Sequence, residues 1–197
     1  MSLSAFAFAV LLLLLTPGPT NTLLAVSGAT RGLMASLPLI GAECAGYLTA
    51  IVPLVFLAAP LLIDQPAAAL GIKLASTLWV LLLAARLWMR PPSANAQGGT
   101  TVAAVYATTV LNPKALIIGL ALIPAAGTGS LEALLRPLPY LAVFSLLVLV
   151  VATCWLSAGA AILRRLATTS PLLFGRVAAS CLAVFALSLA GRAIGWI

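Results

Sequence analysis

Long apolar stretches, separated by short polar connections, run through nearly the whole chain. Of the 197 residues, 63% are hydrophobic and 7% are charged, whereas soluble domains carry roughly a quarter charged residues. A helix needs about 20 mostly apolar residues to cross a bilayer. The sequence therefore predicts an all-α integral membrane protein. Six stretches have the length of a spanning helix, at residues 2–24, 33–60, 66–89, 102–124, 137–162 and 172–195.

The apolar run from Ala5 to Leu15 imitates a secretory signal peptide. A signal peptide begins with basic residues and ends at a small-residue cleavage site. Neither feature flanks this run, and Arg31 is the first charged side chain. We therefore expect the run to be retained as the first helix.

The basic residues predict how the spans are oriented. Loops on the cytoplasmic side of a membrane carry an excess of lysine and arginine. The loops after spans one, three and five hold or adjoin most of the basic residues, namely Arg31, Arg86, Arg90, Arg164, Arg165 and Arg176. These loops are predicted to be cytoplasmic and both termini to lie outside, in a multi-pass protein of the inner membrane. The formal charge of +7 does not indicate nucleic-acid binding, because the basic residues are spread between apolar spans and are not clustered along one segment.

A polar linker divides the chain into two halves of three spans each. Residues 91–101 are rich in Pro, Gly, Ser and Asn, a composition typical of flexible linkers. It separates residues 1–90 from residues 102–197 within a single transmembrane domain, 1–197. If the halves are repeats, an odd number of crossings inserts the second half upside down, which gives two inverted-topology three-helix repeats.

Helix-breaking and polar residues interrupt the first span. Proline removes a backbone donor and clashes with the preceding turn, and glycine permits unusual backbone angles. Opened backbone survives in lipid only where protein buries it or where it lines a cavity. A new helix beginning after the break has free N–H groups that favour an anion. The sequence predicts substrate-binding residues here, at Thr16, Pro17, Gly18, Pro19, Thr20 and Asn21. The alternative is a proline kink that shapes packing alone.

A second break, at Asn112, Pro113 and Lys114, interrupts the fourth span. Broken helices at corresponding positions of two halves are typical of the substrate sites of transporters. A lysine in mid-membrane costs about 2.5–3.5 kcal/mol on insertion scales, so it normally has a partner. We expect these three residues to join the substrate site. The alternative for Lys114 is that its side chain extends to the membrane interface.

Glu43 is the one acidic residue within a predicted span. Three roles are open to it: carrying a coupling proton, receiving a substrate ammonium group, or pairing with Lys114. Gly46 and Ala50 follow on the same helix face and leave it slim, which favours close contact with another helix.

Several of these motifs together resemble the LysE/RhtB family of amino-acid exporters. The segment Thr16 to Asn21 resembles the opening Thr-Pro-Gly-Pro motif of the family, and Leu111 to Ala115 closely matches its Asn-Pro-Lys motif. The remaining anchors are Gly28 to Gly32 and the stretch Lys73-Leu74-Ala75 with Trp79 and Arg86. The resemblance covers essentially the whole chain. It implies efflux of amino acids or related small zwitterions, driven by the proton gradient.

The chain departs from the family pattern at four positions. Thr20 stands where Asp or Asn is usual, Ser76 and Ala84 stand where glycine is usual, and Glu43 does not belong to the pattern. One hypothesis is that Glu43 replaces the acidic function that Thr20 lacks.

Other functions are less compatible with the composition. A metal-ion exporter would need His, Cys or clustered carboxylates, but the chain has no histidine and three acids. Cys44, Cys154 and Cys181 form no CxxC pair and are expected to be small buried apolar residues. An intramembrane enzyme would need a nucleophile paired with a base, and the chain has neither a histidine nor a second acid within a predicted span. No catalytic residue, metal or cofactor is therefore predicted. A structural membrane protein would not need two polar breaks.

Gly191 and Gly195 fit a small-residue packing face that a homodimer could use.

Overall fold

The computed structural model describes residues 2–58, 66–89, 100–127 and 129–193, and every regular element within these ranges is a helix. The predicted all-α fold is thus confirmed. Two continuous helical stretches, Leu33–Leu57 and Leu131–Leu163, are long and apolar enough to cross a membrane. Two bent helix pairs raise the number of candidate spans to four. Six spans and inverted repeats stay predictions. Asp64, Arg90, Gly195 and most of the linker 91–101 lie outside the described residues.

The first half of the chain begins with a broken helix. Its elements are α1 (Leu3–Leu15), α2 (Pro19–Arg31), α3 (Leu33–Ser36), α4 (Pro38–Pro53), the π-helix η1 (Leu54–Ala58) and α6 (Pro66–Met89). The first predicted span, 2–24, ends too early, because α2 continues to Arg31 and the chain leaves the helix at Gly32, with φ of 83°. Pro53 is the last residue of α4, and the π-helix η1 begins at the next residue.

The second half repeats this order of elements. Its elements are α7 (Val102–Val110), α8 (Pro113–Ile117), the π-helix η2 (Ile118–Leu122), α9 (Leu131–Leu135), α10 (Leu138–Ala158), the π-helix η3 (Gly159–Leu163), α11 (Arg164–Thr169) and α12 (Pro171–Ala193). In each half a broken helix comes first, a long helix that ends in a π-helix comes second, and a single helix comes third. The fifth predicted span, 137–162, is shorter than the stretch Leu131–Leu163 that the structure contains.

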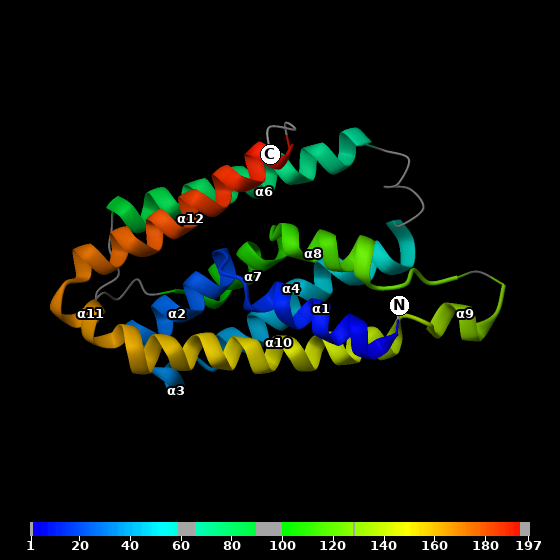
Figure 1. The fold of residues 1–197 in the computed structure, drawn as a ribbon, viewed down its shortest axis with the longest axis horizontal. Coiled ribbons are helices and arrows are strands. Elements are labelled where there is room, and N and C mark those ends of the chain that lie inside the picture. The colour runs from blue at the N-terminus through cyan, green and yellow to red at the C-terminus, as the bar shows by residue number, and fades with distance from the viewer. Residues whose placement is uncertain (1, 59–65, 90–99, 128, 194–197) are drawn as a thin grey trace.

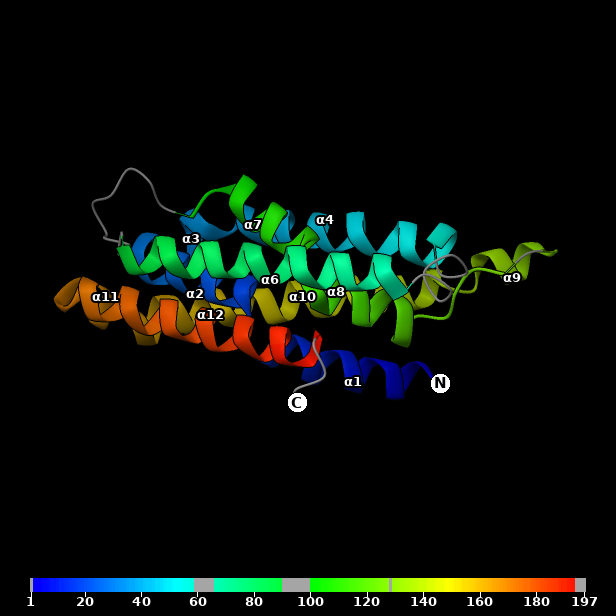
Figure 2. The same cartoon turned by 90° about the horizontal axis from the view of Figure 1, so that it is seen from above.

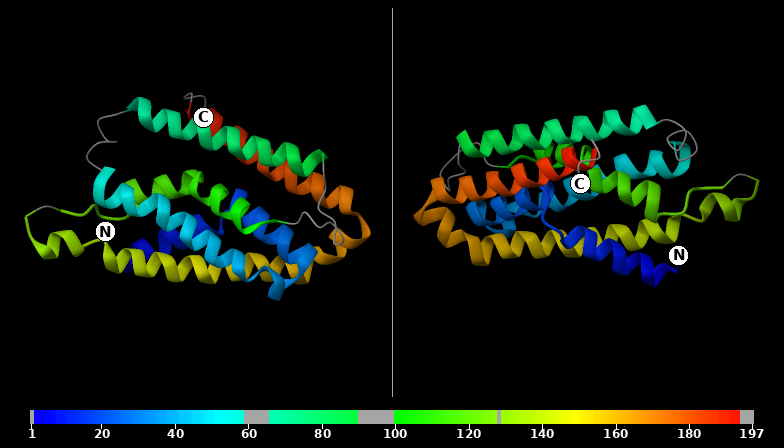
Figure 3. Two further views of the ribbon diagram at one scale, coloured as in Figure 1. Left: turned by 180° about the vertical axis from the view of Figure 1, so that it is seen from behind. Right: turned by 45° about the horizontal axis from the view of Figure 1, so that its top comes forward.

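Each long helix packs against the broken helix of the other half (Figures 1 and 3). Helix α4 lies along α7, where a Cβ atom on Gly46 would come within 2.8 Å of the Cβ atom of Thr109. The close helix contact expected at Gly46 is thereby confirmed. Helix α10 lies along α2, where a Cβ on Gly28 would overlap the carbonyl oxygen of Leu156 and one on Gly159 would overlap that of Ala25. Small residues allow two backbones to approach closely within a membrane.

Helices α6 and α12 pack mainly on each other and lie together along one side of the bundle, at the top in Figure 1 and in front of the other helices in Figure 2. Near one end of this pair, the Arg176 guanidinium lies 5.5 Å from the centroid of a Trp88 ring. The C-terminal part of α2 reaches the same end, because Val26 and Ala29 pack against Phe174 of α12. Arg31, Arg86, Arg164, Arg165 and Arg176 are therefore gathered at one end of the bundle. The orientation of that end in a membrane stays a prediction.

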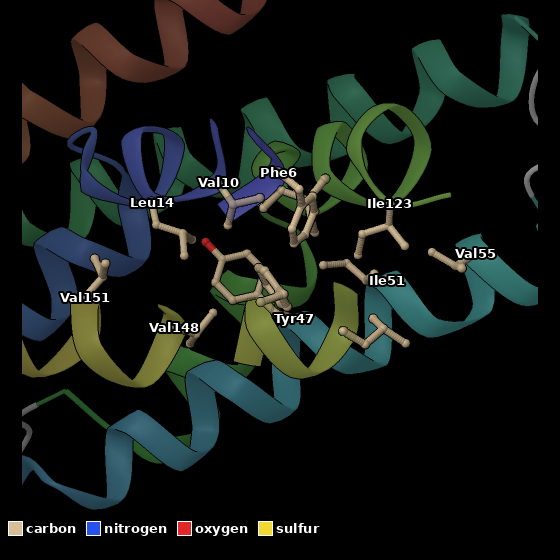
Figure 4. Close-up of a cluster of buried hydrophobic side chains, with 13 residues drawn as sticks. Phe6, Val10, Leu14, Tyr47, Ile51, Val55, Ile123, Val148 and Val151 are labelled. Atoms are coloured by element: carbon tan, nitrogen blue, oxygen red, sulfur yellow. The ribbon is translucent and has the colours of Figure 1, made fainter. Parts of the chain in front are cut away.

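The largest apolar core joins α1, α4, η1, η2 and α10 (Figure 4). Phe6 and Val10 enter it from α1, Tyr47 and Ile51 from α4, and Phe144 from α10. This core lies next to the two helix breaks and holds their flanking elements in place. The expected burial of the cysteines is wrong in part: Cys44 is half-buried, but Cys154 and Cys181 are exposed on the helix surface.

Candidate functional site

The first break separates α1 from α2 with a bend of 60°. The chain leaves the helix at Thr16, which is extended, and the nitrogens of Pro17 and Pro19 carry no hydrogen, so the carbonyl groups at the end of α1 lack their usual helical donors. Asn21 replaces them: its Nδ2 donates to the carbonyl oxygen of Leu14 at 2.7 Å and to that of Thr16 at 2.9 Å. Asn21 thus repairs the backbone at the break, and its part in substrate binding stays a prediction.

The second break bends α7 against α8 by 44°. Asn112 is the N-cap of α8, since its Oδ1 accepts a hydrogen bond from the backbone nitrogen of Lys114 at 3.0 Å. Pro113 occupies the first helical position, where a missing N–H costs no hydrogen bond. With Oδ1 committed to the cap, the amide nitrogen of Asn112 is directed away from α8.

The two breaks meet through hydrogen bonds between side chains. Asn112 Nδ2 donates to Thr20 Oγ1 at 3.2 Å and to the hydroxyl of Tyr47 at 3.3 Å. Thr20 Oγ1 also lies 3.2 Å from Thr109 Oγ1. Because the hydroxyl of Thr109 donates to the carbonyl of Val105 and has a single hydrogen, Thr20 must be the donor to Thr109. These buried bonds join α2, α4, α7 and the start of α8 into one polar cluster.

Lys114 makes the second connection between the breaks. Its Nζ donates to the carbonyl oxygen of Thr16 at 2.6 Å, across 98 residues of sequence. The side chain is only 3% exposed, so the alternative in which it extends to the membrane interface is wrong. An ammonium group at this carbonyl also complements the negative end of the α1 dipole.

Glu43 lies in α4 beside this cluster and is 2% exposed. Its Oε2 has no hydrogen-bond partner, although its charge and that of Lys114 attract each other. Glu43 and Lys114 therefore interact through the attraction of their charges, and Oε2 makes no hydrogen bond to Lys114. A buried polar atom without a partner is uncommon and calls for an explanation. A ligand that donates a hydrogen bond would supply one.

Two predicted site residues do not direct their side chains into the cluster. Thr16 and Pro17 are exposed, and the Thr16 hydroxyl donates to the carbonyl of Leu13 at 2.6 Å. Thr16 contributes its carbonyl oxygen instead. Pro17, Gly18, Pro19 and Pro113 shape the backbone, and the polar side chains come from Thr20, Asn21, Glu43, Asn112 and Lys114.

Sequence reasoning missed Tyr47 and Thr109. Tyr47 lies one helical turn after Glu43, on the same face of α4, and a search for polar groups at that spacing would have found it. Thr109 precedes the second break by one turn, but its contact with Thr20 depends on the packing of the two halves and leaves no local signal.

The residues present do not favour a metal ion. In the part of the chain that the structure describes, no group of three or more His, Cys, Asp and Glu residues could hold one. The described acids offer a single buried carboxylate at the site, whereas hard metal ions require several oxygen ligands.

Comparison with known proteins identifies no relative: no protein family, no curated protein and no solved structure matches this chain.

Replacing Asn112 by alanine is expected to lower the free energy of unfolding by about 2 kcal/mol, because α8 loses its cap and two buried groups lose a donor. Ser130→Ala is the matched control, since Ser130 caps α9 through an exposed bond of 3.1 Å to the Ala133 nitrogen. It is expected to cost about 0.5–1 kcal/mol. Thermal unfolding in detergent, followed by circular dichroism, measures both. Equal shifts in the two variants would contradict the bridging role of Asn112.

Proposed function

We propose that this protein is a secondary-active exporter of amino acids or related small zwitterions, of the LysE/RhtB type, and not an enzyme. The observation that carries the proposal is the meeting of two broken helices, one from each half, around one buried acid and one buried base. Broken helices that meet near the middle of the membrane are the usual setting of a transport site.

The charges of the site suit a zwitterion. Glu43 and Lys114 are the buried charged residues among those described, and their formal charges cancel. A substrate that carries one ammonium and one carboxylate keeps the site neutral, whereas an ion of single charge would leave an uncompensated charge in a low-dielectric interior. Lys114 and the start of α2 can serve the carboxylate, and Glu43 can serve the ammonium.

Proton antiport follows from the same carboxylate. Glu43 can bind either a proton or the ammonium group of a substrate, but not both at once. A group that binds two cations in competition exchanges one for the other as the site opens to alternate sides of the membrane. This supports coupling of export to proton entry, with Glu43 as the coupling residue.

The repeated order of elements supports two inverted three-helix repeats in six spans, with α6 and α12 as the third helix of each repeat. In this arrangement the basic helix ends face the cytoplasm and the termini face outward. Each long helix packs along the broken helix of the other repeat. Rocking of one repeat against the other therefore changes the access of substrate to the site.

An export assay tests the proposal. Cells that overproduce the protein are expected to excrete, and to resist, at least one member of a panel of amino acids and analogues. In proteoliposomes, a proton gradient imposed in the direction of antiport is expected to accelerate transport of that compound. If metal ions but no zwitterion were moved, or if nothing in the panel were excreted, the proposal would be wrong.

A further inference from the structure

The hydroxyl group of Tyr47 has a hydrogen that no residue in the described part of the chain accepts. The side chain is 1% exposed, and its oxygen accepts the hydrogen bond from Asn112 Nδ2. An amide nitrogen can only donate, so this bond leaves the phenolic hydrogen unused. Figure 4 shows the ring of Tyr47 within the core, with its hydroxyl end directed toward Leu14 of α1. An unused donor therefore lies beside the first break.

Glu43, one turn earlier on α4, supplies the complementary feature. Its Oε2 is buried and accepts no hydrogen bond. Residues four positions apart lie on the same face of a helix, so α4 presents an unused acceptor and an unused donor side by side. Buried polar groups are normally paired. A single ligand that both donates and accepts would satisfy the two groups together.

Lys114 narrows the chemistry of that ligand. Of the three N–H groups of its ammonium, one donates to the carbonyl of Thr16, and the other two are available to an anion. The acceptor part of the ligand thus meets Lys114 and Tyr47, and the donor part meets Glu43. An anionic acceptor and a cationic donor on one small molecule describe a free α-amino acid.

We propose that Glu43 and Tyr47 form the subsite that recognises the α-amino and α-carboxyl groups of the substrate. Glu43 Oε2 accepts a hydrogen bond from the substrate ammonium, and the Tyr47 hydroxyl donates one to the substrate carboxylate. Tyr47 is then a specificity-determining residue. The inference rests on the proposed export function, and it adds that both groups must be free: the decarboxylated amine and the 2-hydroxy acid are poor ligands.

The test compares Tyr47→Phe and Glu43→Gln in proteoliposomes. The common amino acids are screened first with the unmodified protein, and the best substrate is then competed with its decarboxylated amine and its 2-hydroxy acid. Tyr47→Phe keeps the ring, which contacts Phe144 edge-on at 5.4 Å between centroids. It is expected to weaken the apparent affinity for the amino acid about tenfold and to leave that for the amine unchanged. Glu43→Gln is expected to weaken affinity for the amino acid but not for the 2-hydroxy acid.

Tyr106→Phe is the matched control, because the Tyr106 hydroxyl donates to Thr49 Oγ1 at 3.1 Å in an exposed position. Its affinities are expected to equal those of the unmodified protein. Unchanged affinity for the amino acid in Tyr47→Phe would overturn the role of Tyr47 and leave the export function standing. If Tyr47→Phe does not fold, competition in the unmodified protein decides the inference: a decarboxylated amine that binds as tightly as the amino acid would overturn it, and weaker binding of the amine supports it. If the unmodified protein transports no amino acid, the inference and the proposed function fail together.

Discussion

Replacement of Lys114 by methionine is expected to abolish export and to lower the free energy of unfolding by about 3 kcal/mol. The carbonyl of Thr16 keeps its bond from Asn21 but loses the charged donor that joins the two breaks. Glu43 becomes a buried acid that has lost the positive charge of Lys114. Export is measured in proteoliposomes loaded with the best substrate of the panel, and stability by thermal unfolding in detergent.

The double variant Lys114→Met, Glu43→Gln separates the two effects. Removing both charges leaves neither uncompensated, so much of the lost stability is expected to return while export stays absent. Arg165→Gln changes an exposed arginine of α11 and is expected to alter neither quantity. Export at the normal rate in the single or the double variant would exclude Lys114 from the site.

The second large effect is expected at Gly28, where α2 crosses α10. Gly28→Ala places a Cβ atom on the carbonyl oxygen of Leu156. Backbone atoms cannot rotate away as a flexible side chain can, so the helices must separate. We expect the free energy of unfolding to fall by about 3 kcal/mol and export to fall with it, because this crossing holds α2 beside the break.

Gly41→Ala is the matched control for this change. Gly41 also lies in a helix, α4, but a Cβ atom there meets nothing within 4 Å. Alanine is a better helix former than glycine by about 1 kcal/mol, so this variant is expected to be as stable as the unmodified protein or more stable. Thermal unfolding of both variants, side by side, decides the matter: a neutral Gly28→Ala would mean that α2 and α10 do not approach as closely as described.

The breaks and their convergence could be predicted from the sequence, whereas the partners inside the site could not. Proline, glycine and asparagine act on their own backbone, so the interruptions after Leu15 and at Asn112 have local causes. The partner of Lys114 is the backbone carbonyl of Thr16. Because every residue has such a carbonyl, the sequence does not single out this one. Thr20 was singled out because it lacks the usual amide or charge, yet its hydroxyl joins the two breaks.

Burial was harder to predict than chemistry, for a physical reason. In a membrane protein the surface that faces lipid is as apolar as the interior, so hydrophobicity does not separate them. For this reason the expected burial of Cys154 and Cys181 was wrong, since both are exposed. Glycine is ambiguous in a similar way: Gly28 follows the predicted first span, 2–24, but in the structure it lies inside α2 and packs against α10.

Because each long helix packs against the broken helix of the other half, these contacts depend on both halves having been synthesised. Helix α2 makes its closest contact with α10, which emerges from the ribosome more than one hundred residues later. Until then, the amide of Asn21 can repair the end of α1, but Thr20 has neither Thr109 nor Asn112 to bond. These contacts between the halves can therefore form only after the second half has been synthesised, and the polar break of the first half lacks them until then.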